Sequence, residues 1–162
     1  MIHSIGNGYF DFVSFHTSFF DGDRDDQQHV DMKKLSDAEI DTLMLFQNSV
    51  LERTNLKGRN KESHTDEHGN AIGSALSYAQ CCVWHYHAGP YQNGVQNDTT
   101  PDLPVNLKGC GSAAIIHYIK DIPNRRIIVI GYSREHIPFP QANSRNNPLR
   151  HRMYTWRGRI VD

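Results

Sequence analysis

The chain has 162 residues, of which 38% are hydrophobic and 22% charged, and its formal net charge is -1. This length fits a single domain, residues 1–162, with its own core. No run reaches the roughly 18 apolar residues that a membrane-spanning helix needs. The first residues, MIHSIGNGYFDF, lack the basic start and apolar run of a secretion signal. Three cysteines, two of them adjacent, do not suggest a disulfide framework, so we expect a cytoplasmic protein.

The predicted elements begin with a strand and one long helix. Residues 9–19, YFDFVSFHTSF, alternate aromatic and polar side chains at the period of a strand. An acidic loop, residues 20–34, follows. Ser36 and Glu39 have the spacing of a capping box, and apolar side chains then recur every three or four positions. The sequence therefore predicts a helix over residues 36–54.

The second half of the chain contains three segments rich in β-branched and aromatic residues, which predict strands over 80–88, 113–120 and 125–132. The connection between the first two, residues 89–112, is long and polar, so we expect a surface loop. The short connection between the last two suits a hairpin. We therefore expect an α+β fold in which an antiparallel β-sheet of about four strands packs against the N-terminal helix.

Charge is spread unevenly along the chain. Residues 1–40 contain eight acidic and three basic side chains, whereas residues 108–162 contain ten basic and three acidic ones. A basic C-terminal third, ending in a basic extension over 141–162, is typical of a surface that binds a polyanion. The alternative is that the acidic and basic segments neutralise each other across the fold, and the sequence leaves it open.

Two histidines occupy alternate positions of the segment VWHYHAGPY. Alternate residues of a strand share a face, so His85 and His87 project together, and an antiparallel neighbour could add His117. Imidazole can donate or accept a proton near neutral pH, and three imidazoles can also bind zinc. The sequence has no HExxH, no CxxC and no carboxylate at a short fixed spacing, which disfavours a metal. The histidines could also be ordinary polar residues of a half-exposed sheet.

Basic and aromatic side chains adjoin these strands. The segment LKGRNK, after the predicted helix, alternates three cations: Lys57, Arg59 and Lys61. Such a run either caps the helix C-terminus or grips phosphate. The segment GYSREHIPFP places Tyr132, Arg134 and His136 directly after the last strand. Functional sites are often built at such a rigid strand end.

The order of these segments resembles a known family. A helix, LKGRNK, a WHYH strand, IIHYIK and IIVIGYSREHIPF resemble the RelE/ParE superfamily of bacterial toxins, including its YafO-like branch, over roughly residues 36–140. The resemblance implies a helical part packed on a four-stranded antiparallel sheet. It also implies a metal-independent endoribonuclease without a cofactor, an mRNA interferase that acts on RNA or the ribosome and is neutralised by a protein antitoxin. It does not extend to the N-terminal strand, the acidic loop or the C-terminal extension.

This resemblance and the chemistry of RNA cleavage together suggest roles for particular residues. Cleavage needs a base, an acid and cations, and unpaired bases can stack on aromatic rings. The candidate catalytic residues are His85, His87, His117, Arg134 and Tyr132. The candidate substrate-binding residues are Lys57, Arg59, Lys61, Tyr86, Tyr91 and His136.

Three other functions stay open. Relatives with the same fold poison DNA gyrase without cleaving anything, so the chain could be a non-catalytic toxin. The acidic N-terminal segment could instead mimic a polyanion and inhibit a nucleic-acid enzyme, as in a phage-type inhibitor. A third alternative is a zinc hydrolase whose ligands are His85, His87 and His117.

Overall fold

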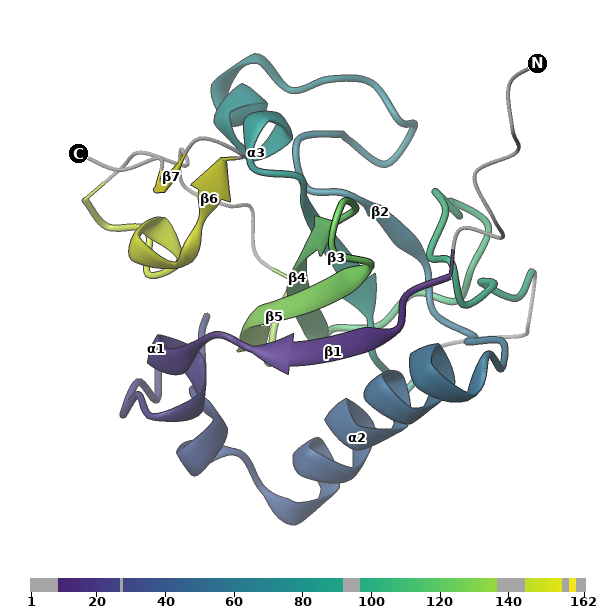
Figure 1. Ribbon diagram of the computed structural model, residues 1–162, viewed down its shortest axis with the longest axis horizontal. Helices are drawn as coiled ribbons and strands as arrows, with labels where there is room; N and C mark the ends of the chain where they lie inside the picture. The colour runs from purple at the N-terminus through teal and green to yellow at the C-terminus, as the bar shows by residue number, and fades with distance from the viewer. Residues whose placement is uncertain (1–8, 27, 92–96, 137–144, 156–157, 160–162) are drawn as a thin grey trace.

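The computed structural model describes residues 9–26, 28–91, 97–136, 145–155 and 158–159 (Figure 1). Its centre is a five-stranded sheet with the order β1-β5-β4-β3-β2. The strands are β1 (Phe12–Phe15), β2 (Asn60–Glu62), β3 (Val83–His87), β4 (Ile115–Asp121) and β5 (Arg126–Ser133). A separate two-stranded hairpin follows near the C-terminus, formed by β6 (Tyr154–Thr155) and β7 (Gly158–Arg159).

The helices lie around this sheet. The α-helices are α1 (Thr17–Phe20), α2 (Asp37–Glu52) and α3 (Leu76–Gln80). Short 3-10 turns are η1 (Met32–Lys34), η2 (Gly73–Ala75) and η3 (Arg150–Arg152). Among these elements, α2 and α3 lie on opposite sides of the sheet (Figure 1). No helix in these ranges combines the length and the apolar character needed to cross a membrane.

Helix α2 forms as its sequence predicts. Ser36 Oγ accepts from the Glu39 backbone N–H at 3.2 Å, while the Glu39 carboxylate accepts from the Ser36 backbone N–H at 2.8 Å. This capping box satisfies two amide groups that have no partner within the helix. The helix ends two residues earlier than predicted, where Arg53 takes a left-handed conformation with φ 60°. Its Phe46 ring packs on two tyrosines of the sheet, so α2 covers one face.

The α+β class is confirmed, but the expectation of a purely antiparallel sheet of four strands is wrong. Three of the predicted strands form the antiparallel series β3-β4-β5, and β2, which the sequence did not predict, extends it, whereas β1 pairs in parallel with β5. A parallel pair needs a long crossover connection, and here the chain runs through α2 and three strands between β1 and β5. The strand predicted over residues 9–19 is shorter than expected, because His16 caps the start of α1.

The two faces of the sheet differ in character. The α2 face carries the larger apolar core, which includes Tyr86, Tyr118 and Val129. The opposite face carries a smaller apolar core at one end, where Tyr78 and Leu149 pack against the sheet. The same face carries His85, His87 and His117, and we call it the histidine face. Polar side chains therefore adjoin apolar packing on this face.

Two expectations about local structure are corrected. Cys81 and Cys82 do not lie in a strand, because α3 ends at Gln80 and Cys82 has φ 53°. The segment 89–112 is not simply a surface loop, since its described part pairs with the stretch before and in β2. Leu103 is fully buried, and the Asn60 side-chain amide donates to its carbonyl oxygen at 3.0 Å.

The uneven charge is partly neutralised within the fold. Acidic side chains of the N-terminal segment form ion pairs with basic side chains of the C-terminal part: Asp11 with Arg125, Asp25 and Glu39 with Arg134, and Asp31 with Arg152. The last of these pairs is almost fully buried. These arginines bind carboxylates of the same chain, which favours the neutralising alternative over a polyanion surface made from them.

Candidate active site

Strand pairing gathers polar side chains in a row on the histidine face. Lys61 of β2 lies opposite His85 of β3, and His85 lies opposite His117 of β4. Directly opposite residues project from the same face of a sheet. His87, two residues beyond His85, projects from that face as well. The structure thus brings together the three histidines as the sequence predicts.

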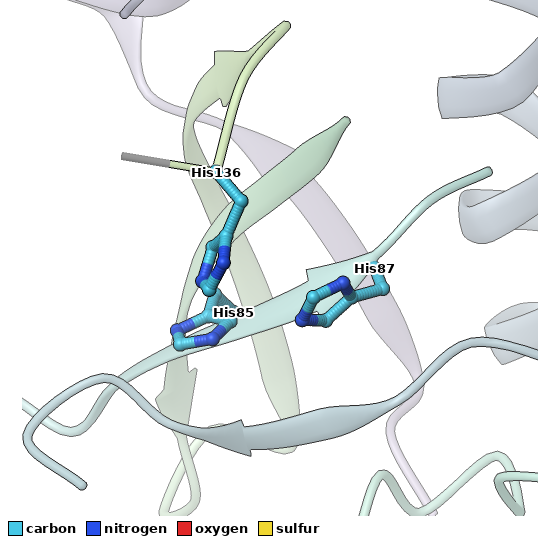
Figure 2. Close-up of side chains that lie close together, drawn as sticks. All are labelled: His85, His87 and His136. Carbon is cyan, nitrogen blue, oxygen red and sulfur yellow. The ribbon is translucent and has the colours of Figure 1, made fainter. Parts of the chain in front are cut away.

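His136 joins His85 and His87 from the segment after β5 (Figure 2). Its ring centroid lies 5.5 Å from that of His85 and 5.0 Å from that of His87, while the latter two are 5.8 Å apart. One ring nitrogen from each of the three lies within 4.8 Å of the others. The sequence placed His136 among substrate-binding residues, and the structure places it directly beside the strand histidines.

Two cations flank this cluster. Arg59 and Lys61 both lower the pKa values of His87 and His136, although burial is the larger cause at each. Lys61 is itself buried, which lowers its pKa, and its Nζ donates to the Thr65 carbonyl oxygen at 2.7 Å. We call the set formed by His85, His87, His136, Arg59 and Lys61 the histidine site.

Burial keeps the strand histidines neutral. His85 and His87 are only 2% and 3% exposed, and burial lowers the pKa of His87 to about 4. The pKa of His85 is lowered well below its ordinary value for the same reason. His136 is exposed as a residue, yet its ring turns toward the strand pair and its pKa is also lowered. The histidine site is therefore a buried imidazole pair with a third imidazole at the surface.

His87 is held by one peptide segment. Its Nδ1 lies 3.0 Å from the backbone N–H of Ser112 and 2.9 Å from the backbone carbonyl oxygen of the same residue. Nδ1 can therefore accept from the amide or, when it carries a proton, donate to the carbonyl. The Nε2 of His87 is buried and has no hydrogen-bond partner in the described ranges. Either tautomer of His87 is thus accommodated, with Nε2 left for another group.

His117 lies deeper than the histidine site. It has no measurable exposure, its Nε2 is 2.6 Å from Ser133 Oγ, and its ring centroid is 5.3 Å from that of His29. The sequence predicted a catalytic role for His117, but no substrate can contact this side chain in the structure. Sequence reasoning missed His29, because the stretch around it has no motif and no strand long enough to show a period.

Tyr132 of β5 and Arg134, which directly follows that strand, project away from the histidine site. Arg134 donates to both oxygens of the Glu39 carboxylate, at 2.6 and 3.1 Å, and also binds Asp25. Tyr132 is 2% exposed in the core beneath α2. The predicted catalytic roles of Arg134 and Tyr132 do not fit these positions, since Ser133 between them is the residue that faces His117.

The predicted stacking tyrosines are also engaged elsewhere. Tyr86 is 2% exposed, and its hydroxyl accepts from the Gly58 backbone N–H and bonds to the Tyr91 hydroxyl. Tyr86 therefore cannot stack on a base, and Tyr91 serves as its hydrogen-bond partner. The side chain of Lys57 is exposed, but it is not among the charges that shift the histidine pKa values.

Comparisons with known proteins do not extend this description. No family model matches the chain, and neither a curated protein nor a solved structure does. The chemistry must therefore be argued from the site. Neutral imidazoles next to two cations can bind an anion and exchange protons with it.

Proposed function

We propose that the chain is an endoribonuclease that cleaves RNA at the histidine site without a metal. One observation supports this most. Residues 59–61, 85–87 and 136 are far apart in the sequence, yet they place three imidazoles beside two cations, Arg59 and Lys61. The charged groups that shift the pKa values of these three histidines are Arg59, Lys61 and other histidines. An environment of that kind favours an anion such as a phosphodiester.

The reaction is transfer of the phosphodiester to the neighbouring 2′-oxygen. A base takes the proton from the 2′-hydroxyl, and the 2′-oxygen forms a bond to phosphorus. The bond from phosphorus to the 5′-oxygen breaks, and an acid gives that oxygen a proton. The products are a 2′,3′-cyclic phosphate and a 5′-hydroxyl. Arg59 and Lys61 would stabilise the negative charge that builds up on the phosphate oxygens.

His87 and His136 suit the two proton-transfer roles. The peptide groups of Ser112 accommodate both neutral tautomers and the protonated form of His87, which a residue that gains and loses a proton requires. His136 is the member of the histidine site at the surface, so it can reach the leaving oxygen. Because Nε2 of His87 is buried, the His136 side chain must turn outward before a phosphate reaches it. His85, which lies on β3 with His87, contacts the rings of both His87 and His136.

We further propose that this ribonuclease is a toxin of the RelE/ParE type, active in the cytoplasm on mRNA or the ribosome and neutralised by an antitoxin. Support comes from the packing of α2 on the antiparallel series β2 to β5, which matches the arrangement that the resemblance implies. Strand β1, in parallel with β5, lies outside that resemblance.

The test is cleavage of a labelled single-stranded RNA by purified protein in EDTA, with and without translating ribosomes. We expect wild type to cleave, and a deoxy version of the RNA to stay intact because it lacks the nucleophile. His87→Asn and His136→Asn should lower the rate by at least about 100-fold, as loss of a positioned acid or base does. His68→Asn, at an exposed histidine in a turn, is the matched control.

Other outcomes would favour the alternatives. Full cleavage by both histidine variants, with native circular dichroism, would remove the histidine site from the mechanism. Cleavage that disappears in EDTA and returns with zinc would favour a zinc hydrolase. Growth arrest on expression without any RNA cleavage would favour a non-catalytic toxin.

A further inference from the structure

We propose that His85, His87 and His136 form a binding site for a single zinc ion, and that zinc bound there blocks the active site. The binding stands on the geometry of the three side chains alone. The blocking rests on the ribonuclease proposed above, because zinc would occupy the nitrogen atoms that move protons.

The three nitrogens are near the separation that zinc requires. In a tetrahedral site with Zn–N bonds of about 2.0–2.1 Å, ligand nitrogens are about 3.4 Å apart. Here they lie within 4.8 Å of one another. His85 and His87 lie on strand β3, whereas His136 follows the end of β5 and is exposed, so its side chain is free to rotate toward the strand pair. Three protein ligands leave the fourth position open to water or an anion.

His87 also has the outer partner that a zinc ligand usually has. Ligating histidines almost always donate their second ring N–H to a carbonyl or carboxylate, which fixes the tautomer. The Ser112 carbonyl oxygen lies 2.9 Å from Nδ1 of His87 and can accept that bond. In this tautomer Nε2 carries the free lone pair, and that buried atom has no hydrogen-bond partner elsewhere in the described chain. This arrangement is independent of the clustering of the three rings.

The surrounding charges affect the binding of zinc and of an RNA phosphate in opposite directions. Arg59 and Lys61 repel a divalent cation, but they attract an anion into the open coordination position. Imidazole ligands select zinc and similar transition metals over magnesium and calcium, which prefer oxygen. Removing a flanking positive charge should therefore strengthen zinc binding and weaken RNA binding. A variant with opposite effects on the two ligands separates the two proposals.

The experiment is a zinc titration of the full chain, after EDTA treatment and without RNA, against a competing chromophoric chelator. We expect one zinc ion per chain and no competition by magnesium. His136→Ala should weaken binding by more than about tenfold, since loss of even an outer partner of a ligand has an effect of that size. His136 is exposed, so this variant should keep the wild-type fold and melting temperature. His68→Ala should bind as wild type does.

A cobalt-loaded sample gives a second readout. Tetrahedral cobalt absorbs strongly in the visible range, and we expect that band in wild type but not in His136→Ala. Arg59→Gln should bind zinc several-fold more tightly. Zinc binding that is absent, that survives His136→Ala, or that is lost equally in His68→Ala would overturn the site. A cleavage rate that rises on adding zinc would overturn the blocking.

Failure of the two proposals can be told apart. The titration contains no RNA, so a chain without ribonuclease activity would still bind zinc if the metal site is correct. Conversely, a chain that cleaves RNA in EDTA but binds no zinc supports the ribonuclease and overturns the metal site.

Discussion

Replacing Arg152 by methionine should destabilise the protein severely, because it leaves a buried carboxylate without its cation. Arg152 Nη2 lies 2.8 Å from Asp31 Oδ1, with side-chain exposures of 7% and 3%, and Arg152 Nη1 donates to the Ile130 carbonyl oxygen at 2.9 Å. Breaking a buried ion pair from one side costs about 3–5 kcal/mol. A buried carbonyl left without its donor adds about 1–3 kcal/mol.

The assay is urea unfolding of Arg152→Met, of Asp31→Asn and of the double variant. We expect Arg152→Met to lower the free energy of unfolding by at least about 3 kcal/mol. The double variant should recover part of this loss, because it no longer buries an unpaired charge. A loss below about 1 kcal/mol, the size of an exposed ion pair, would refute the reasoning. So would strict additivity of the two single changes, since residues in contact are expected to couple.

Three further perturbations test the scaffold of the site. Gly58→Ala should destabilise the fold and reduce cleavage, measured by thermal melting and RNA assay, because the added Cβ would lie 1.8 Å from the His87 carbonyl oxygen; a normal melting temperature would contradict this. Burial lowers the pKa of His29 to about 4, so neutral His29 contributes stability that is complete above about pH 6.5 and is lost as the pH falls toward 4. In urea unfolding from pH 7 to 4, the free energy of unfolding of His29→Asn should therefore fall less than that of wild type, by up to about 3 kcal/mol. Identical pH profiles would argue against a buried, neutral His29. Ser133→Ala should lower stability by about 1–3 kcal/mol through the lost bond to His117 while leaving zinc affinity unchanged, as checked by the same titration.

The sequence predicted the features that depend on residues close together in the chain. The capping box at Ser36 specifies where α2 begins, and the alternation of a strand puts His85 and His87 on one face. Both depend on residues at most three positions apart, so the sequence shows them directly. The antiparallel pairing of β3 and β4 added His117, because a pairing register also follows simple alternation.

Features set by distant contacts were not predictable in this way. Arg134 has the position of a functional residue after a strand, but its partner Glu39 is 95 positions away, and that contact turns it from the site. The parallel pairing of β1 depends on the crossover as a whole. His29 reaches His117 because the neighbouring Val30 pairs with Tyr132 of β5, a long-range contact that no local pattern indicates.

The Glu39 carboxylate links the first long helix to the last strand of the sheet. One of its oxygens accepts from the Ser36 backbone N–H within the capping box, and both accept from Arg134 at the end of β5. The helix cap is local and can form early in folding, whereas the arginine arrives only when β5 has joined the sheet. Completion of the sheet therefore reinforces the start of α2. We expect these two distant segments to open together in native-state hydrogen exchange, as a single cooperative unit.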